Sequence, residues 1–214
     1  AGGALVRKNN KTQDVWSVFC TGTLIRPDVV LSAAHCIMGL WYYGDLQNYG
    51  FTLDHDLTGK TRPDHFEGFV DYSINPDFKA GKIAGTSVSH FVGDLVLLKL
   101  RNPIDVTDLT PVLTDKDSFM LSDPVLTGVG YGNNRSLHPT FPAYDRGVGV
   151  KRKGNFSFSK TLDVEIPSSG GYVEDALIYS VALEGENAIT CNGDSGGPLY
   201  GKIDGTPQII GVLA

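Results

Sequence analysis

Short apolar runs separated by glycine and proline constrain this chain more than any other feature of its sequence. The 214 residues include 26 glycines and 11 prolines, and few windows show the 3.6-residue apolar period of an amphipathic helix. The runs are rich in β-branched and aromatic residues, as strands are, and cover residues 16–19, 29–32, 66–72, 95–100, 124–129, 160–166, 176–183 and 208–213. This pattern predicts an all-β protein of the sandwich or barrel type.

Two segments are predicted to be connections rather than strands. Residues 101–117 are polar and carry Pro103 and Pro111, so they are the best candidate for a link between two halves of the chain. Residues 144–160 are expected to form an exposed loop. The basic run 151–153 inside that loop is interpreted as a solvated face rather than a binding patch.

Charge and hydropathy exclude several functional classes. The net charge of −6 argues against nucleic acids or acidic membranes as partners, because both select for an excess of lysine and arginine. The longest apolar runs, such as residues 95–98, are far shorter than the roughly 20 residues that cross a bilayer. No basic-then-apolar leader opens the chain, so we expect any export signal to have been removed.

The segment 192–199, NGDSGGPL, is the strongest candidate for a chemical site. It places Ser195 among three glycines. Such a serine can simply belong to a turn. Alternatively, it is a nucleophile on a tight bend, where glycines let backbone N–H groups converge on a developing oxyanion. A nucleophilic serine needs a base within hydrogen-bond reach, and that base needs a group that fixes its tautomer.

The order of residues along the chain narrows the choice of base and acid. The five histidines all precede Ser195, which excludes the order serine, acid, histidine of the α/β-hydrolases. His35 lies in LSAAHC, at the end of an apolar run. Asp94 opens the apolar run GDLVLLKL, where a carboxylate is costly to bury unless it is hydrogen-bonded. Taken singly, His35 and Asp94 could each be structural, and His55, His90 and His138 are expected to be surface groups.

Taken together, LSAAHC, GDLVLLKL and CNGDSGGPL resemble the chymotrypsin-like, trypsin-fold serine proteases. Weaker similarities at residues 19–25, 73–78 and 126–132 extend the resemblance over about the whole chain. The resemblance implies an all-β fold of two Greek-key antiparallel β-barrels with the active site in the cleft between them. We expect residues 1–108 to form the barrel that carries His35 and Asp94, and residues 109–214 to form the barrel that carries Ser195.

The resemblance also assigns a role to each residue of the site. His35 would be the general base and then the general acid, Asp94 would orient it, and Ser195 would attack the peptide carbonyl to form an acyl-enzyme. The backbone N–H groups of Gly193 and Ser195 would form the oxyanion hole. Asp194 would pair with a freshly cut N-terminal ammonium, which makes the protein a zymogen before cleavage. The chain opens Ala-Gly-Gly without the expected Ile or Val, so either a residue is missing or the activation chemistry differs.

The cysteines and the N-glycosylation sequons indicate in which cellular compartment the protein is found. By resemblance, Cys20 and Cys36 form a disulfide beside the catalytic histidine, the alternative being two buried free thiols. Sequons at Asn10, Asn134 and Asn155 are weak signs of glycosylation. Together with the disulfide they favour a secreted glycoprotein.

Substrate preference is predicted from the segment before Ser195. Six residues before it, at the floor of the implied specificity pocket, stands Ile189, and Thr190 and Asn192 are expected to line the same pocket. An isoleucine there leaves nothing to pair with a lysine or arginine of the substrate, which would lose its hydration without compensation. We therefore expect a preference for apolar side chains.

The family has more chain after its serine than this sequence has, so the second barrel is expected to lack its C-terminal strand and helix. Cys191 would then pair with a cysteine on a separate C-terminal segment; the alternative is a truncated, inactive relative.

No cofactor is expected. Asp54, Asp56, Asp64 and Glu67 suggest an irregular calcium site, but His65 stands where a calcium loop needs its bidentate glutamate, so a polar surface loop is the default.

The leading function is a secreted serine endopeptidase that acts on proteins or peptides. The rival is a latent or inactive protease-like module with a binding or regulatory role. The presence of His35, Asp94 and Ser195 together favours the enzyme.

Overall fold

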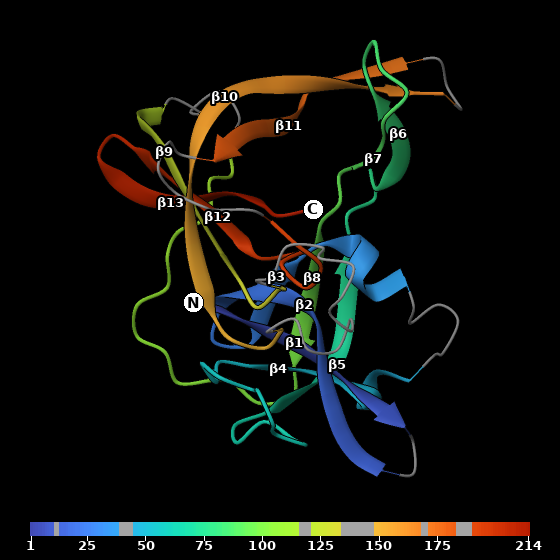
Figure 1. The fold of residues 1–214 in the computed structure, drawn as a ribbon, viewed down its shortest axis with the longest axis vertical. Coiled ribbons are helices and arrows are strands. Elements are labelled where there is room, and N and C mark those ends of the chain that lie inside the picture. Colours follow the sequence, from blue (N-terminus) through green and yellow to red (C-terminus); the bar gives the residue numbers. More distant parts are fainter. Residues whose placement is uncertain (11–12, 39–44, 116–120, 134–147, 168–170, 183–189) are drawn as a thin grey trace, which may run out of the picture.

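Two β-structures make up the molecule (Figure 1). The structure is a computed structural model, and it describes the whole chain apart from residues 11–12, 39–44, 116–120, 134–147, 168–170 and 183–189. The first unit is a closed barrel whose strands, in pairing order, are β1 (Gly2–Asn10), β2 (Gln13–Arg26), β3 (Val29–Ser32), β8 (Val96–Leu100), β5 (Glu67–Ile74) and β4 (Tyr49–Thr52). Short 3-10 helices η1 (Ala34–Ile37) and η2 (Leu46–Asn48) follow β3 and precede β4.

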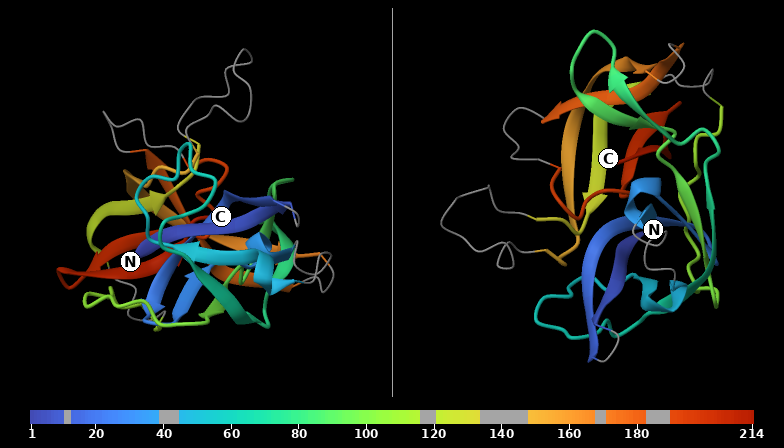
Figure 2. Two further views of the ribbon diagram at one scale, coloured as in Figure 1. Left: turned by 90° about the horizontal axis from the view of Figure 1, so that it is seen from below. Right: turned by 90° about the vertical axis from the view of Figure 1, so that its right-hand side faces the viewer.

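The second unit is a seven-stranded sheet, which lies above the barrel in the right-hand view of Figure 2. In pairing order its strands are β13 (Thr206–Val212), β12 (Pro198–Ile203), β9 (Leu121–Gly130), β10 (Arg152–Ile166), β6 (Lys79–Ile83) and β7 (Ser89–Val92), with β11 (Gly171–Ala182) added on β10. No helix in the described segments has the length and apolar character needed to cross a membrane.

The all-β prediction is confirmed, and every predicted run coincides with or overlaps a strand. The sequence patterns did not reveal β1, β4, β6, β7 or β12. The strand β6, KAGKI, carries two lysines and a glycine, so its strand conformation comes from pairing with β7 and β10 rather than from propensity. The expected loop over residues 144–160 is wrong from Arg152 onward, because β10 begins there.

Alternation of apolar side chains explains the barrel. Along β8 the side chains of Val96, Leu98 and Leu100 are buried, while those between them are exposed. They pack in one core with Leu24 and Phe51, from β2 and β4. This core closes the barrel and places η1 and the start of β8 at the same end.

The border between the two units differs from the expected division at residue 108. β6 and β7 come from the N-terminal half of the chain, yet Val164 and Glu165 of β10 pair with Ile83 and Lys82 of β6. Within the described part of the chain, the second sheet is open rather than a closed barrel. Residues 101–115 contain no strand, as expected for a connection, and touch the sheet through a bridge of Val112 to Ile209.

A close approach of β1 and β4 requires a glycine, which gives a test of the barrel packing. A Cβ at Gly3 would lie 2.4 Å from the Phe51 ring and 2.4 Å from the Thr52 carbonyl oxygen. Gly3→Ala should therefore lower the free energy of unfolding by about 1–3 kcal/mol in urea denaturation. The control is Gly68→Ala, where the nearest atom is 3.9 Å away. An equal loss in both variants would contradict the packing argument.

Candidate active site

The partly buried imidazole of His35 and the buried carboxylate of Asp94 form a pair at the junction of the two units. His35 lies in η1, and Asp94 lies between β7 and β8 with 8% of its surface exposed. Its Oδ2 lies 2.6 Å from His35 Nδ1, and its Oδ1 accepts the backbone N–H of His35 at 2.8 Å. A carboxylate only accepts hydrogen bonds, so Nδ1 carries the proton and Nε2 keeps its lone pair. The pair can therefore act as a base through Nε2.

One face of the imidazole is covered by an aromatic pair that the sequence reasoning missed. The Phe91 ring stacks on His35 with centroids 6.1 Å apart and planes at 15°, and Phe78 packs on Phe91 at 5.3 Å. Phe91 belongs to β7, so the second sheet helps to fix a histidine that the barrel supplies. Its position three residues before Asp94 was the available signal, but only the pairing of β7 with β6 reveals which way it faces.

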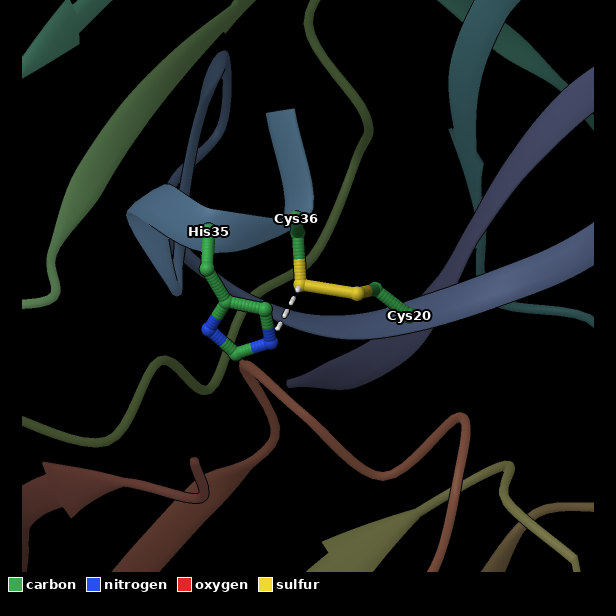
Figure 3. A group of neighbouring side chains, drawn as sticks. All are labelled: Cys20, His35 and Cys36. Atoms are coloured by element: carbon green, nitrogen blue, oxygen red, sulfur yellow. Dashed lines mark hydrogen bonds between the residues drawn. A yellow bond between two sulfur atoms is a disulfide. The ribbon is translucent and has the colours of Figure 1, made fainter. Parts of the chain in front are cut away.

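The predicted disulfide between Cys20 and Cys36 is confirmed, with a Cα–Cα distance of 6.2 Å (Figure 3). Cys36 Sγ lies 3.9 Å from His35 Nε2 and 3.7 Å from the carbonyl oxygen of Ser195. The disulfide thus lies between the imidazole and the serine loop. Ligand-type atoms of Cys20, His35 and Cys36 lie within 4.8 Å of one another, but both sulfurs are used in the disulfide and offer no thiolate to a metal.

Ser195 lies on a tight turn that leads into β12. Gly193 and Gly196 adopt φ values of +101° and +80°, in the left-handed region that favours glycine. Asp194 and Gly197 donate their backbone N–H groups to Cys191 and Asp194 carbonyls, both at 2.9 Å. By contrast, the N–H groups of Gly193 and Ser195 donate to no acceptor among the described residues. The turn thus leaves two donors available to a bound group.

In the described structure, the hydroxyl of Ser195 lacks the direct hydrogen bond to His35 that the carboxylate of Asp94 makes. Within the described part of the chain, no hydrogen bond joins Ser195 Oγ to His35. The backbone carbonyl of Ser195 accepts the N–H of Thr21 at 2.8 Å, which ties the turn to β2. Catalytic hydrogen bonds are often long in unliganded enzymes and shorten only when substrate binds.

Asp194 is held by backbone donors rather than by the Ala1 ammonium. Its Oδ1 accepts the N–H of Gly132 at 2.7 Å and its Oδ2 accepts the N–H of Cys191 at 2.8 Å. The ammonium of Ala1 donates instead to the Leu24 carbonyl at 3.0 Å, and Gly2 and Gly3 lie inside β1. Asp194 and Ala1 are thus not paired in this structure, and the pairing of Asp194 with a freshly cut N-terminal ammonium stays a prediction.

The residues predicted to set specificity are only partly visible. Ile189 lies outside the described residues. Thr190 is exposed and lines a cavity of about 1190 Å³, while Asn192 is exposed and its carbonyl accepts the N–H of Asn133 at 3.0 Å. The described lining of this cavity includes Asp94 but neither His35 nor Ser195, so the cavity opens on the carboxylate side of the site.

Cys191 forms no disulfide within this chain, and its bond to a separate segment stays a prediction.

The carboxylates of the acidic loop proposed as a calcium site accept hydrogen bonds from other groups of the protein. Asp54 accepts His65 Nδ1 at 3.0 Å and the N–H of Asp64 at 2.6 Å. Asp56 accepts from Thr58, Asp64 pairs with Lys60, and Glu67 accepts from Asn102. These oxygens already have protein partners, as the side chains of a polar surface loop do, and the absence of a cofactor stays a prediction.

Comparison with known proteins gives one family. The Trypsin family model matches residues 2–213. The chain is 21% identical to chymotrypsin-like elastase family member 1 of Rattus norvegicus over 226 residues, covering 100% of this chain and 77% of that protein. It is 27% identical to chymotrypsin-C of Mus musculus, and this match covers 94% of this chain and 69% of the relative. It is 28% identical to tryptase of Mus musculus, and that match covers 93% of this chain and 69% of the relative.

Burial raises the pKa of the Asp194 carboxyl, so the free energy of unfolding is predicted to depend on pH. The stability linked to this group is fully present below the ordinary aspartate value of 3.8 and is lost as the pH rises through the raised pKa. The difference in unfolding free energy between the native chain and Asp194→Asn should therefore fall as the pH rises from about 4 to 7. Urea denaturation at several pH values measures it.

Asp108→Asn, at an exposed aspartate, is the control for the loss of one negative charge. A difference between the native chain and Asp194→Asn that grows with pH would contradict the assignment.

Proposed function

Because the chain belongs to the trypsin family, whose serine proteases are hydrolases, we propose that it is a serine endopeptidase that uses Ser195, His35 and Asp94. The single observation that carries this proposal is the 2.6 Å contact between His35 Nδ1 and Asp94 Oδ2, which leaves Nε2 free to accept a proton. The substrates are proteins or peptides, as for the protease relatives.

The reaction follows from the tautomer of His35. As Ser195 Oγ attacks the carbonyl carbon of the scissile bond, its proton passes to His35 Nε2, and Asp94 stabilises the resulting imidazolium. The imidazolium then returns this proton to the leaving amine, which departs from the acyl-enzyme. Water, deprotonated by the same nitrogen, hydrolyses the ester and restores the serine.

The negative charge on the carbonyl oxygen needs donors, and the turn supplies two. The N–H groups of Gly193 and Ser195 have no acceptor among the described residues, which supports their assignment to the oxyanion hole. One such donor typically lowers the barrier by about 3 kcal/mol. The free pair of donors on the same turn as the nucleophile is what distinguishes this arrangement from an ordinary glycine-rich bend.

An extracellular location is part of the proposal. The Cys20–Cys36 disulfide supports it, because such bonds persist in oxidising compartments. Glycosylation gains less support: Asn155 lies within β10 and its side chain accepts a hydrogen bond from Thr127 at 2.9 Å. The sequons that include residues 11–12 and 134–136 fall in segments that the structure does not describe.

A protease-like binding module is the second candidate. It is favoured by the missing hydrogen bond between Ser195 and His35 in the described chain. Titration of active sites separates the two, since only the enzyme reacts stoichiometrically with a serine-directed reagent.

Labelling with a phosphonylating reagent tests the function directly. The native protein should react at Ser195, and Ser195→Ala should lose all labelling because the variant lacks the proposed nucleophile. Ser89→Ala, at an exposed serine of β7, should label like the native chain. Equal labelling of native protein and Ser195→Ala, read by mass spectrometry, would remove Ser195 from its role.

A panel of chromogenic peptides tests the preference for apolar side chains. Peptides with an apolar residue before the scissile bond should be cleaved with a kcat/KM about tenfold or more above that of arginine peptides. Ile189→Asp should shift the preference toward arginine, since it supplies a counter-charge. Thr107→Asp, at an exposed site, controls for the added charge. Fastest cleavage after arginine by the native protein would refute the assignment.

A further inference from the structure

Thr21 is a fully buried residue of β2 whose polar atoms all point to the proposed catalytic turn or its supports. Its Oγ1 donates to the Gly193 carbonyl at 2.7 Å, and its N–H donates to the Ser195 carbonyl at 2.8 Å. The same Oγ1 accepts the N–H of Tyr131 at 3.1 Å, and the Thr21 carbonyl accepts Ser32 Oγ at 2.8 Å. A single barrel residue thus contacts the turn twice.

The two contacts fall on alternate peptide groups of the turn. The Gly193 carbonyl belongs to the peptide that joins residues 193 and 194, and the Ser195 carbonyl to the peptide that joins 195 and 196. The proposed oxyanion donors, the N–H groups of Gly193 and Ser195, belong to the peptides before each of these. Thr21 therefore holds the peptide planes that flank the donors and leaves the donors themselves free.

The direction of the Thr21 hydroxyl proton is fixed by its other partner. Because Oγ1 accepts the N–H of Tyr131, its own proton is left to point at the Gly193 carbonyl. Tyr131 is itself immobilised, since it is fully buried and its hydroxyl donates to the Asp54 carbonyl at 2.8 Å. The next residue, Gly132, donates to Asp194 at 2.7 Å. The segment 131–132 therefore contacts both Thr21 and the turn.

The other end of the peptide between Gly193 and Asp194 is also bonded. The Asp194 N–H donates to the Cys191 carbonyl at 2.9 Å, so both polar atoms of this peptide are satisfied. The plane of this peptide cannot rotate without breaking one of these bonds. Removing the Thr21 hydroxyl would release its carbonyl side and let the neighbouring Gly193 N–H turn away.

We propose that the Thr21 hydroxyl is a positioning group that sets the oxyanion hole from the barrel side. This inference rests on the proposed function. It makes Thr21 important for the transition state rather than for substrate binding, because charge on the carbonyl oxygen develops only in the reaction.

The chain offers a matched control two residues away on the same strand. Thr23 is also fully buried in β2, but within the described structure its Oγ1 has no hydrogen-bond partner. Valine replaces a threonine hydroxyl with a methyl group of similar volume. At position 21 this change removes two hydrogen bonds, and at position 23 it removes none.

The experiment compares Thr21→Val, Thr21→Ser and Thr23→Val with the native chain on an apolar chromogenic peptide. Thr21→Val should lower kcat by between about tenfold and hundredfold, less than the 10²–10³ typical of deleting an oxyanion donor outright, with KM nearly unchanged. Thr21→Ser keeps the hydroxyl and should restore most of kcat. Thr23→Val should keep the native kcat.

A peptidyl boronic acid, which forms a tetrahedral adduct with the serine, should bind Thr21→Val more weakly by the same factor as kcat/KM falls. Circular dichroism at the assay temperature shows whether each variant is folded. Should Thr21→Val fail to fold, the ratio of kcat between Thr21→Ser and Thr21→Ala reports the same hydroxyl without the methyl group.

The inference is overturned if Thr21→Val keeps the native kcat, or if only its KM changes. It is equally overturned if Thr23→Val lowers kcat as much as Thr21→Val does. It is also overturned if serine at position 21 is no better than valine or alanine. These outcomes differ from failure of the proposed function, in which the native protein itself is not labelled at Ser195; in that case both proposals fall.

Discussion

The junction between β2 and the turn that carries Ser195 is the contact on which the rest of the arrangement depends. The barrel supplies His35, and the second sheet supplies Ser195, so their separation is set by how closely the two units approach. At the junction, Thr21 bonds to the turn, and a Cβ at Gly196 would lie 2.0 Å from Ser32 Oγ. Only glycine allows this approach. The packing of the two β-units thereby sets the relative positions of the residues in the site.

Two aspartates at this junction, the buried Asp94 and the partly buried Asp194, have different hydrogen-bond partners, and the difference separates their roles. Asp94 is bonded by the backbone and the imidazole of His35, so a side chain that can change its charge lies against it. Asp194 is bonded by the backbone N–H groups of Gly132 and Cys191, which cannot titrate. The first carboxylate is suited to follow a proton transfer, and the second to hold a loop in place.

The site was more predictable than the strands around it. The motifs placed His35 and Asp94 as partners, and the two lie 2.6 Å apart, although their catalytic roles and that of Ser195 stay predictions. The Cys20–Cys36 bond was also anticipated. The role of β6 and β7 in the second sheet was not, because the pairing of β6 with β10 joins segments far apart in the chain. Likewise, the position of Phe91 near Asp94 does not reveal its stacking on His35, because the pairing of β7 with β6 decides which way the ring faces.

The sequence by itself determined the β-class and the family and singled out the residues proposed as reactive groups, because alternation, turn residues and short motifs are local properties of a chain. Only the tertiary structure decided how those groups are supported. In the fold, β6 and β7 belong to the second sheet, the Ala1 ammonium donates to the Leu24 carbonyl, and the Thr21 hydroxyl donates to the turn that carries Ser195. Each of these depends on which distant backbone groups meet, and hydrogen bonds between distant groups are fixed by packing of the whole fold rather than by neighbouring residues.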